Sequence, residues 1–347
     1  MGGAQEIVSR PEMLVHRFDA DRAVFEFLEL SRKKVSETPF LREDVLGDDL
    51  KRSQAALKDI SSILLPQSPP PNYIFHSAFC CSTLLARALD FEGKNLSLRE
   101  PEIFMELSNL KRTGNPIHRD QAQWKNLFGT CLRLLSRPFK DGERILIKPT
   151  NAANNLLEDV LARDDGSKVV LLHAGLRSFL ISILKKGEEG RGFARKLFFI
   201  FQMDSRFAKG WPLETVSRMT DLQLAAVVWR MQMNGFLDAL ERFASNRIRS
   251  LNSEDLLAEP EAVLGRLDDY FGIGLGPDTV SRIAGSDLFQ QHSKFADRTY
   301  DTSVRAEENE RIEAEHGPAL DQIIEWEGNL IPGQPVPQPL PNTILAL

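Results

Sequence analysis

The stretch FHSAFCCSTLLARALD, residues 75–90, decides the fold expected for this chain. It begins at the end of a short apolar run, YIF (73–75), which suits a buried parallel strand. Small residues follow, and the stretch then becomes helical. A strand, a tight loop and a helix in this order are typical of a phosphate site, because the N–H groups of a helix N-terminus favour an anion. The loop has no lysine or glycine, so it is not a Walker-type ATP motif.

Four further apolar runs, alternating with helical segments, predict the rest of a parallel sheet. They are NLSL (95–98), RILIK (144–148), KVVLLH (168–173) and RIRSLN (247–252). The predicted fold class is therefore α/β, with a parallel sheet that carries helices on both faces.

The two ends of the chain differ from this central pattern. Residues 10–64 predict helices, since the spacing of Phe25, Phe27, Leu28 and Leu30 gives one broad apolar face. The segment PQSPPPN (66–72) cannot continue a helix, and five prolines follow residue 330. We expect an N-terminal helical extension and linker over 1–71, an α/β domain over 72–330, and a Pro-rich tail over 331–347.

Composition excludes several classes of function. The formal net charge of -6 argues against nucleic-acid binding through a general basic surface. Three cysteines, two of them adjacent, make no disulfide framework and suit a reducing compartment. No apolar run has the length of a membrane span, and the N-terminus lacks a signal-peptide core. The sequence predicts a cytoplasmic protein without nucleic-acid partner, transmembrane segment or metal cluster, and leaves its oligomeric state open.

The loop and the strand ends supply the candidate site residues. Ser77, Cys80 and Cys81 are small enough to let the backbone approach a phosphate, and Ser82 and Thr83 have hydroxyls that donate to phosphate oxygens. The alternative is an ordinary turn in which Ser82 caps the helix. Ligands of parallel sheets collect beyond the strand ends. Four residues at strand ends are therefore further candidates to meet the charge of a phosphate: His76, Arg99, Lys148 and His173.

Four segments, in order, resemble a sulfotransferase of the P-loop-related fold, the group that uses 3′-phosphoadenosine 5′-phosphosulfate (PAPS). HSAFCCSTLLARALD (76–90) resembles the 5′-phosphosulfate loop, (K/R)-S-G-(T/S)-T-(L/W), and KVVLLHAGLRSFLIS (168–182) resembles the family's strand, R-D-P-R-D loop and helix. RSLNSEDLLAEPEAVLGRLDDYFGI (249–273) resembles the family's "YEDLLADPEATLRRLCEFLGI" region, and QHSKFADR (291–298) resembles a cofactor-closing segment.

The resemblance implies a P-loop NTPase-like fold and transfer of a sulfuryl group from PAPS to a hydroxyl or amine of a small-molecule or peptide acceptor. It assigns Arg177 and Ser182 to the 3′-phosphate and Lys294 to closure over the nucleotide. It assigns the 5′-phosphosulfate to the loop residues Ser77, Cys80, Cys81, Ser82 and Thr83.

The chain departs from the family pattern at two positions. Phe79 stands where the loop's basic residue belongs, and Ala174 stands where the first phosphate-binding arginine is expected. The missing charge would have to come from neighbouring strand ends, and Lys148 is the first candidate.

The chemistry needs a base for the proton of the acceptor. Glu100, in REPE after the second strand, is the first candidate, since the resemblance includes tyrosyl-protein and trehalose-type sulfotransferases with a carboxylate there. His76 is the second candidate. A pair of Arg99 with Glu100 that only orders the loop is the alternative.

Two other functions remain open, a non-catalytic nucleotide-binding module of the same fold and a P-loop-related phosphotransferase. One further segment, GFARKLFFIFQMDSRFAKGW (192–211), is basic and aromatic. It fits an acceptor lid, a membrane-surface helix or a partly buried helix with a basic solvent face.

Overall fold

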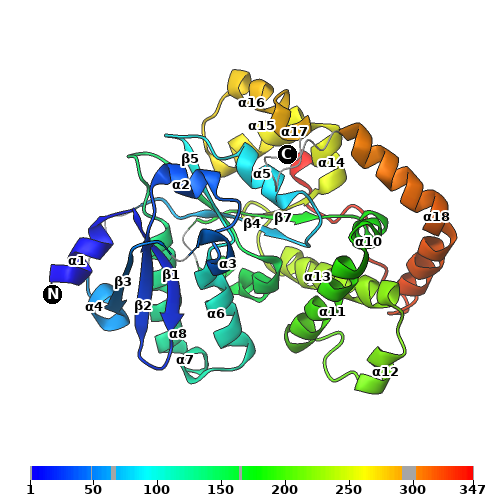
Figure 1. The fold of residues 1–347 in the computed structure, drawn as a ribbon, viewed down its shortest axis with the longest axis horizontal. Helices are drawn as coiled ribbons and strands as arrows, with labels where there is room; N and C mark the ends of the chain where they lie inside the picture. Colours follow the sequence, from blue (N-terminus) through cyan, green and yellow to red (C-terminus); the bar gives the residue numbers. More distant parts are fainter. Residues whose placement is uncertain (1, 48, 64–67, 164–165, 291–301, 347) are drawn as a thin grey trace. The chain divides into compact units, whose positions relative to one another are not determined.

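The computed structural model of the chain describes residues 2–47, 49–63, 68–163, 166–290 and 302–346 (Figure 1). The chain forms two compact units, and each unit joins segments that are far apart in the sequence. The first unit comprises Met1–Phe75, Leu85–Val169 and Asp268–Leu275, and the second comprises His76–Leu84, Val170–Leu267 and Gly276–Leu347.

A five-stranded parallel sheet with helices around it makes this an α/β fold. Its strand order is β5-β6-β4-β7-β8. The strands are Asn72–His76 (β4), Asn95–Arg99 (β5), Arg144–Lys148 (β6), Val169–His173 (β7) and Ile248–Asn252 (β8). Every residue of β4, β5 and β7 is buried, as expected for apolar runs in a parallel sheet. All five predicted strands and the predicted fold class are confirmed.

The strand order reverses at β4. Strands β6 and β5 lie on one side of β4, and β7 and β8 lie on the other. Open α/β sheets bind ligands beyond the carboxyl ends of the strands at such a reversal. The loop that follows His76 therefore begins where this class of sheet binds its ligands.

Helices fill the connections between the strands. Those before β7 are α1 (Gly2–Ser9), α2 (Arg32–Glu37), α3 (Glu43–Leu46), α4 (Leu57–Ser61), α5 (Ser82–Ala88), α6 (Glu102–Arg112), α7 (Pro116–Arg119), α8 (Gln121–Leu135), the 3₁₀ helix η1 (Asn151–Leu156) and α9 (Leu157–Leu161). Those after β7 are α10 (Leu176–Lys185), α11 (Gly187–Asp204), α12 (Leu213–Ser217), α13 (Asp221–Arg242), α14 (Ser253–Ala258), α15 (Pro260–Phe271), α16 (Pro277–Ala284), α17 (Asp287–Gln290), α18 (Thr302–Gly328) and the 3₁₀ helix η2 (Ile344–Ala346).

The prediction of a purely helical N-terminal extension is wrong. Residues 13–56 contain an antiparallel sheet of Met13–Asp19 (β1), Val24–Glu29 (β2) and Arg52–Ala56 (β3), in the order β1-β2-β3. Phe25 and Phe27 are fully buried and alternate with the half-buried Glu26, which is the period of a strand. The Phe25 ring lies 4.9 Å from that of its cross-strand partner Phe18, and this pairing overrides the helical spacing.

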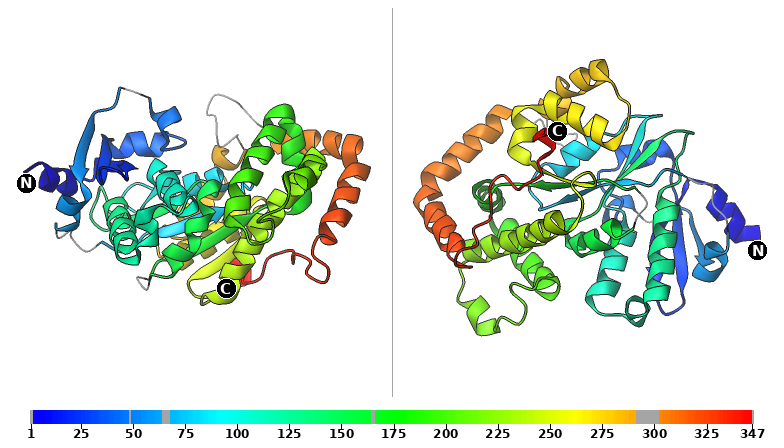
Figure 2. Two further views of the ribbon diagram at one scale, coloured as in Figure 1. Left: turned by 90° about the horizontal axis from the view of Figure 1, so that it is seen from below. Right: turned by 180° about the vertical axis from the view of Figure 1, so that it is seen from behind.

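The Pro-rich tail lies along β8. The Ser250 N–H donates to the carbonyl of Asn342 at 3.0 Å, and the Ser250 hydroxyl donates to the carbonyl of Pro341 at 2.8 Å. Leu340 and Ile344 are buried. Figure 2 shows the tail leaving α18 and returning to η2. The domain boundaries at residues 71 and 330 stay a prediction.

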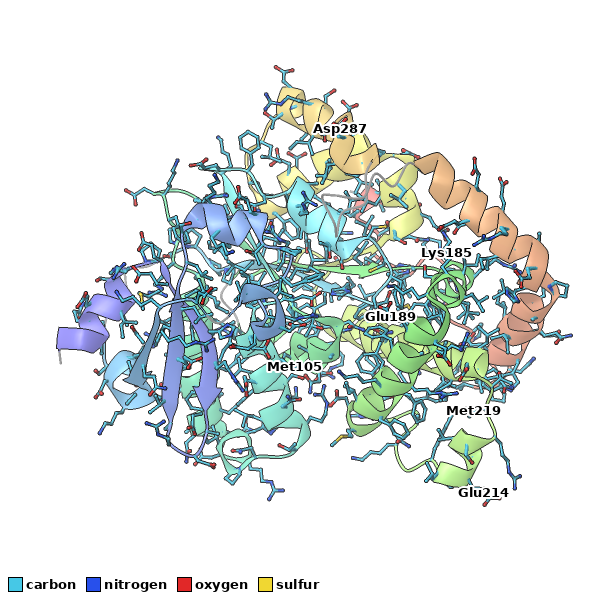
Figure 3. All side chains as sticks on the ribbon, in the orientation of Figure 1. Met105, Lys185, Glu189, Glu214, Met219 and Asp287 are labelled. Atoms are coloured by element: carbon cyan, nitrogen blue, oxygen red, sulfur yellow. The ribbon has the colours of Figure 1, made fainter. Side chains whose placement is uncertain are left out.

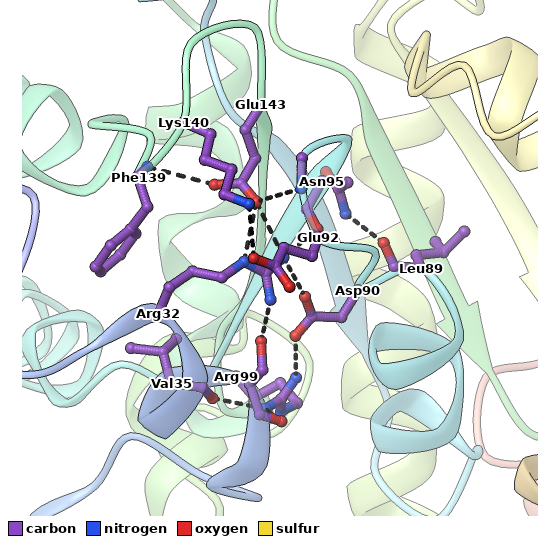
Figure 4. Close-up of polar contacts among 12 residues, drawn as sticks. Arg32, Val35, Leu89, Asp90, Glu92, Asn95, Arg99, Phe139, Lys140 and Glu143 are labelled. Atoms are coloured by element: carbon purple, nitrogen blue, oxygen red, sulfur yellow. Dashed lines mark hydrogen bonds and ion pairs between the residues drawn. The ribbon is translucent and has the colours of Figure 1, made fainter.

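A buried arginine network joins the N-terminal segment to β5 (Figure 4). The Arg99 guanidinium is 1% exposed, pairs with Asp90 at 3.1 Å and donates to the carbonyls of Val35, Ser36 and Thr38 at 2.6–2.8 Å. Burial lowers the pKa of Arg99 from its ordinary value, against the opposing effect of Asp90. The side chain therefore closes the carbonyl end of α2 rather than facing a ligand.

The same network fixes the chain that follows α2. Arg32 pairs with Asp90 at 2.9 Å and with the buried Glu143 at 3.0 Å. The Leu41 N–H donates to the carbonyl of Arg99 at 2.7 Å, and the Leu41 carbonyl accepts the N–H of Glu102 at 3.1 Å. Residues 38–42 are therefore held against the end of β5.

We predict that Arg99→Met destabilises the chain severely. The substitution removes one of the two cations that pair with Asp90 and leaves the carbonyls at the end of α2 buried without their donor, which costs roughly 3–5 kcal/mol. Urea unfolding of the parent and the variant measures the effect. Arg22→Met, at a side chain that is 64% exposed, is the control and should change stability by less than about 0.5 kcal/mol. Equal midpoints for Arg99→Met and the parent would contradict this account of the network.

Candidate functional site

The loop after β4 has an unusual backbone for a stretch without glycine. Ala78, Phe79 and Cys81 have φ angles of +67°, +50° and +60°, all in the left-handed region. Each such residue costs about 1–2 kcal/mol relative to the right-handed conformation. Turns of this kind point successive N–H groups toward one side and form the anion-binding concavity known from P-loops. In the family pattern glycine stands at the position of Cys81, and here cysteine adopts the conformation that favours glycine.

Polar contacts at the end of β4 hold this loop. The Ala78 N–H donates to Nδ1 of His76 at 3.2 Å, and the Ser77 N–H donates to the carbonyl of Leu172 at 3.0 Å. The Ser77 hydroxyl accepts the N–H of Ala174 at 3.2 Å. His76 is buried, and its imidazole supports the first left-handed residue of the loop. Because Nδ1 accepts this hydrogen bond, neutral His76 carries its proton on Nε2, and Nδ1 is the nitrogen that could take another.

Phe79, in the place of the expected basic residue, belongs to an aromatic cluster. Its ring lies 5.6 Å from that of Phe179 on α10 and 5.5 Å from that of Phe193 on α11, both in edge-to-face geometry. Aromatic pairs in this geometry contribute about 0.5–1.5 kcal/mol beyond the burial of their area. The side chain thus anchors the loop by packing and brings no charge to it.

The hydroxyls at the start of α5 are not used for capping. Ser82 and Thr83 are 6% and 3% exposed, and in the described part of the chain neither side chain forms a hydrogen bond. Their hydroxyl oxygens are not among the buried polar atoms that lack a partner, so solvent or a ligand can reach them. Cys80 is buried and Cys81 is half-buried, and neither is part of a disulfide. The loop therefore offers two hydroxyl donors beside its backbone amides.

The end of β7 departs from the expected phosphate site. Ala174 is fully buried, and its carbonyl accepts the indole N–H of Trp229 at 2.9 Å. Arg177 on α10 is 38% exposed and forms ion pairs with Glu313 and Asp321 of α18. The Ser182 hydroxyl donates to the carbonyl of Ser178, one turn earlier, at 2.9 Å. Both residues assigned to the 3′-phosphate are therefore engaged within the chain.

Acidic side chains gather around α10. The Ser178 hydroxyl donates a hydrogen bond to the Glu254 carboxylate. Oε1 of Glu254 lies 3.5 Å from the position that a Cβ atom on Gly175 would occupy. Lys185, labelled in Figure 3, pairs with Glu308 of α18 at 3.4 Å. A carboxylate thus lies beside the N-terminus of α10, where the helix dipole favours negative charge.

A second polar cluster lies at the ends of β5 and β6, in the first unit. Glu100 has a φ of +51°, and its N–H donates to the carbonyl of Lys148 at 2.7 Å. The Glu100 carboxylate lies 2.6 Å from Nζ of Lys148, and the two side chains are 9% and 1% exposed. The strand pairing and the ion pair together bring the predicted base and the predicted cation into contact.

Two residues of this cluster were missed from the sequence. Arg42 pairs with the other carboxylate oxygen of Glu100 at 3.2 Å, and also with Asp44 at 2.8 Å. The Phe40 ring lies under both cations, with Nζ of Lys148 at 5.3 Å and Cζ of Arg42 at 5.1 Å from its centroid. A cation over an aromatic face is stabilised by the ring quadrupole. The stretch PFLRED (39–44) has no family pattern that singles these residues out.

Other predicted contributors to the site do not supply charge. Arg99 pairs with Asp90 and Glu100 pairs with Lys148, so the alternative in which Arg99 pairs with Glu100 is wrong. His173, at the end of β7, is 1% exposed, and burial lowers the pKa of its imidazole to about 4. It is therefore neutral at pH 7. Lys294 lies outside the described residues.

The part of the chain that the structure describes has neither a metal-type cluster nor a membrane-spanning helix. No group of three or more His, Cys, Asp or Glu side chains that could hold a metal ion occurs among them. None of the helices described has the length and apolar character needed to cross a membrane.

Comparison with known proteins gave matches among solved structures. The chain is similar to the sulfotransferase domain from the curacin biosynthetic pathway (16% identity over 72% of this chain and 99% of that one, TM-score 0.42). It is also similar to sulfotransferase STF9 from Mycobacterium avium (14% identity, 76% and 80% covered, TM-score 0.42) and to mouse sulfotransferase SULT7A1 complexed with PAP (10% identity, 79% and 88% covered, TM-score 0.40). No family model and no curated protein matches the sequence.

We predict that glycine at position 81 relieves backbone strain. Cys81→Gly should be more stable than Cys81→Ala by about 0.5–1 kcal/mol, since glycine loses the left-handed penalty but adds chain entropy. Both variants lose the thiol, so urea unfolding of the pair isolates the backbone effect. Ala86→Gly, within helix α5, is the control, and this variant should be about 1 kcal/mol less stable than the parent. If Cys81→Gly and Cys81→Ala unfold alike, residue 81 is not strained.

We predict that His173 makes the chain less stable in mild acid. Its folded pKa of about 4 lies below the ordinary 6.5, so the unfolded chain binds a proton that the folded chain refuses. The free energy of unfolding should fall by up to about 3 kcal/mol from this group as the pH drops from about 6.5 to 4. Unfolding of His173→Gln across this range should show a shallower slope than the parent. An unchanged slope in His173→Gln would contradict the assignment.

Proposed function

We propose that the protein transfers a sulfuryl group from PAPS to a hydroxyl or amine of a small-molecule or peptide acceptor. The observation that carries the proposal is the loop after β4. Its three left-handed residues orient backbone amides as in an anion-binding turn, and the hydroxyls of Ser82 and Thr83, at the start of α5, form no hydrogen bond within the described residues.

These features fit the 5′-phosphosulfate of PAPS, which supplies the sulfuryl group when bound. Ser77, Cys80 and Cys81 leave the loop backbone accessible because their side chains are small. Ser82 and Thr83 donate hydrogen bonds to the phosphosulfate oxygens. The loop itself holds no cation, and we assign the compensating positive charge to Lys148.

The pair of Glu100 and Lys148 fits the catalytic roles. Glu100 accepts the proton of the acceptor as its oxygen or nitrogen bonds to sulfur, and the bond between sulfur and the phosphate oxygen breaks. Lys148 stabilises the negative charge that develops on that bridging oxygen. Arg42 pairs with Glu100, and the Phe40 ring contacts both Lys148 and Arg42. These contacts keep the side chains of Glu100 and Lys148 in place. His76 remains the second candidate for the base.

The 3′-phosphate assignment fits less well. Arg177 and Ser182 would contact that phosphate only if it displaced Glu313 and Asp321 from Arg177. Lys294 would close over the nucleotide. These ion pairs, together with the packing of Phe79, favour a second candidate function, a nucleotide-binding module of the same fold that has lost catalysis.

Calorimetric titration with 3′-phosphoadenosine 5′-phosphate tests the nucleotide without an acceptor. We expect binding that is tighter than for AMP, because AMP lacks the 3′-phosphate. Thr83→Val should weaken binding by roughly 10-fold to 150-fold, the value of one charge-assisted hydrogen bond. Thr279→Val, on the half-exposed side of α16, is the control and should bind like the parent. Absence of binding by the parent would refute both candidate functions.

Incubation with PAPS and a mixture of phenol and amine acceptors separates the two candidates. Transfer of sulfate that Glu100→Gln abolishes, while nucleotide binding persists, supports the enzyme. Binding without transfer to any acceptor supports the non-catalytic module.

A further inference from the structure

Three large exposed apolar side chains lie close together in the sequence, within residues 199–213. Among the described residues, the large hydrophobic side chains that are exposed are Phe199 (51%), Met203 (54%) and Leu213 (71%). Single exposed hydrophobic residues are normal, but a concentration of them in one place marks an interaction site. All three belong to α11, α12 and the loop between these helices.

Local packing explains why these residues face outward. Helix α11 packs on α10 and α13, and its buried side includes Leu197, Phe198 and Phe201. Phe199 and Met203 are four residues apart and so share the opposite face of the helix. This arrangement leaves their side chains exposed while the helix itself is well anchored.

The loop after α11 is held to the end of that helix. The Gln202 side chain donates to the carbonyls of Ala208 and Trp211, each at 3.3 Å. The rings of Phe207 and Trp211 lie 5.1 Å apart, and both are half-buried. Leu213 follows directly and begins α12, which Figure 1 shows at the outer end of the α11–α13 pair. The exposed leucine is therefore presented by an ordered segment.

Unpaired cations accompany the apolar side chains. Lys196, Arg206 and Lys209 are exposed, and none forms an ion pair within the described part of the chain. Other cations nearby differ, since Arg195 pairs with Asp221 and Arg218 with Glu214. Lys196 precedes Phe199 by three residues and so lies on the same face of α11. These three cations are a local feature, because the chain as a whole has a net charge of -6.

We propose that this segment docks on the anionic lipid surface of a membrane. The docking surface consists of Lys196, Phe199, Met203, Arg206, Lys209 and Leu213. Apolar side chains enter the headgroup region while lysine and arginine contact lipid phosphates, which is the pattern of interfacial helices. A protein partner is a weaker fit, because lysine is depleted at protein–protein interfaces. The half-buried Trp211 suits the same boundary, where tryptophan is enriched.

Flotation of the full-length chain with lipid vesicles tests the proposal. The parent should bind phosphatidylcholine vesicles that contain phosphatidylserine and should not bind vesicles of phosphatidylcholine alone. Lys196→Gln/Arg206→Gln/Lys209→Gln should weaken binding on the order of a hundredfold, since each cation near the surface contributes. Phe199→Ser/Met203→Ser/Leu213→Ser should also weaken it, and added salt should weaken binding of the parent.

A matched control has the same change of charge elsewhere. Lys58→Gln/Lys94→Gln/Lys125→Gln removes three exposed lysines outside the segment and should bind like the parent. Melting temperatures should be close to the parent's for all three variants, since the substituted side chains are exposed. If the serine variant fails to fold, the glutamine variant carries the test.

Three results would overturn the proposal. One is the absence of binding to anionic vesicles, and another is an equal loss of binding in the control variant. The third is a concentration-dependent dimer in analytical ultracentrifugation that the serine variant abolishes, because the surface would then cover a second copy of the chain.

Discussion

The buried guanidinium of Arg99 constrains the first unit of this protein. It neutralises Asp90 and binds the carbonyls at the end of α2, so residues 38–42 are held against the end of β5. The loop in turn places Phe40 and Arg42 on the pair of Glu100 and Lys148. A buried cation is tolerated only with such a set of partners. The geometry of the candidate catalytic pair therefore depends on a residue that is closed off from ligands.

Backbone strain occurs both in the loop after β4 and at the residue that follows β5. Ala78, Phe79, Cys81 and Glu100 are left-handed residues without the freedom of glycine. Such conformations persist only where surrounding contacts over-determine them, and they cluster at functional positions. The contacts are identifiable here. His76 and Ser77 hold the first loop, the Phe79 ring is packed, and Glu100 is fixed by the backbone and side chain of Lys148.

The second unit has two groups of cations, which differ in whether acidic side chains pair with them. Around α10 the cations are paired, since Arg177 and Lys185 contact acidic residues of α18. Along α11 and the loop after it, Lys196, Arg206 and Lys209 have no acidic partner among the described residues. An ion pair on a protein surface contributes little, whereas an unpaired cation keeps its full attraction for an external anion. The two regions therefore differ in their capacity to bind anionic partners.

The parallel sheet and the strand–loop–helix after β4 follow from local sequence patterns. Buried parallel strands are continuous apolar runs that a reader recognises without knowing their neighbours. Chain order also placed Glu100 and Lys148 at strand ends, and the structure pairs the two side chains, while their catalytic roles stay predictions. The N-terminal sheet was not predictable in this way, since the spacing of Phe25, Phe27 and Leu28 fits a helix until Phe18 pairs across the strands.

Which of the basic side chains can meet an anionic ligand depends on the tertiary packing. Arg99 and Lys148 look alike as basic residues at strand ends, yet one binds carbonyls of α2 and the other pairs with Glu100. Arg177 matched a phosphate-binding arginine, and the structure pairs it with α18, far along the chain. Ion pairs of this kind join residues more than a hundred positions apart. No local pattern encodes them, because their geometry exists only after the helices have packed.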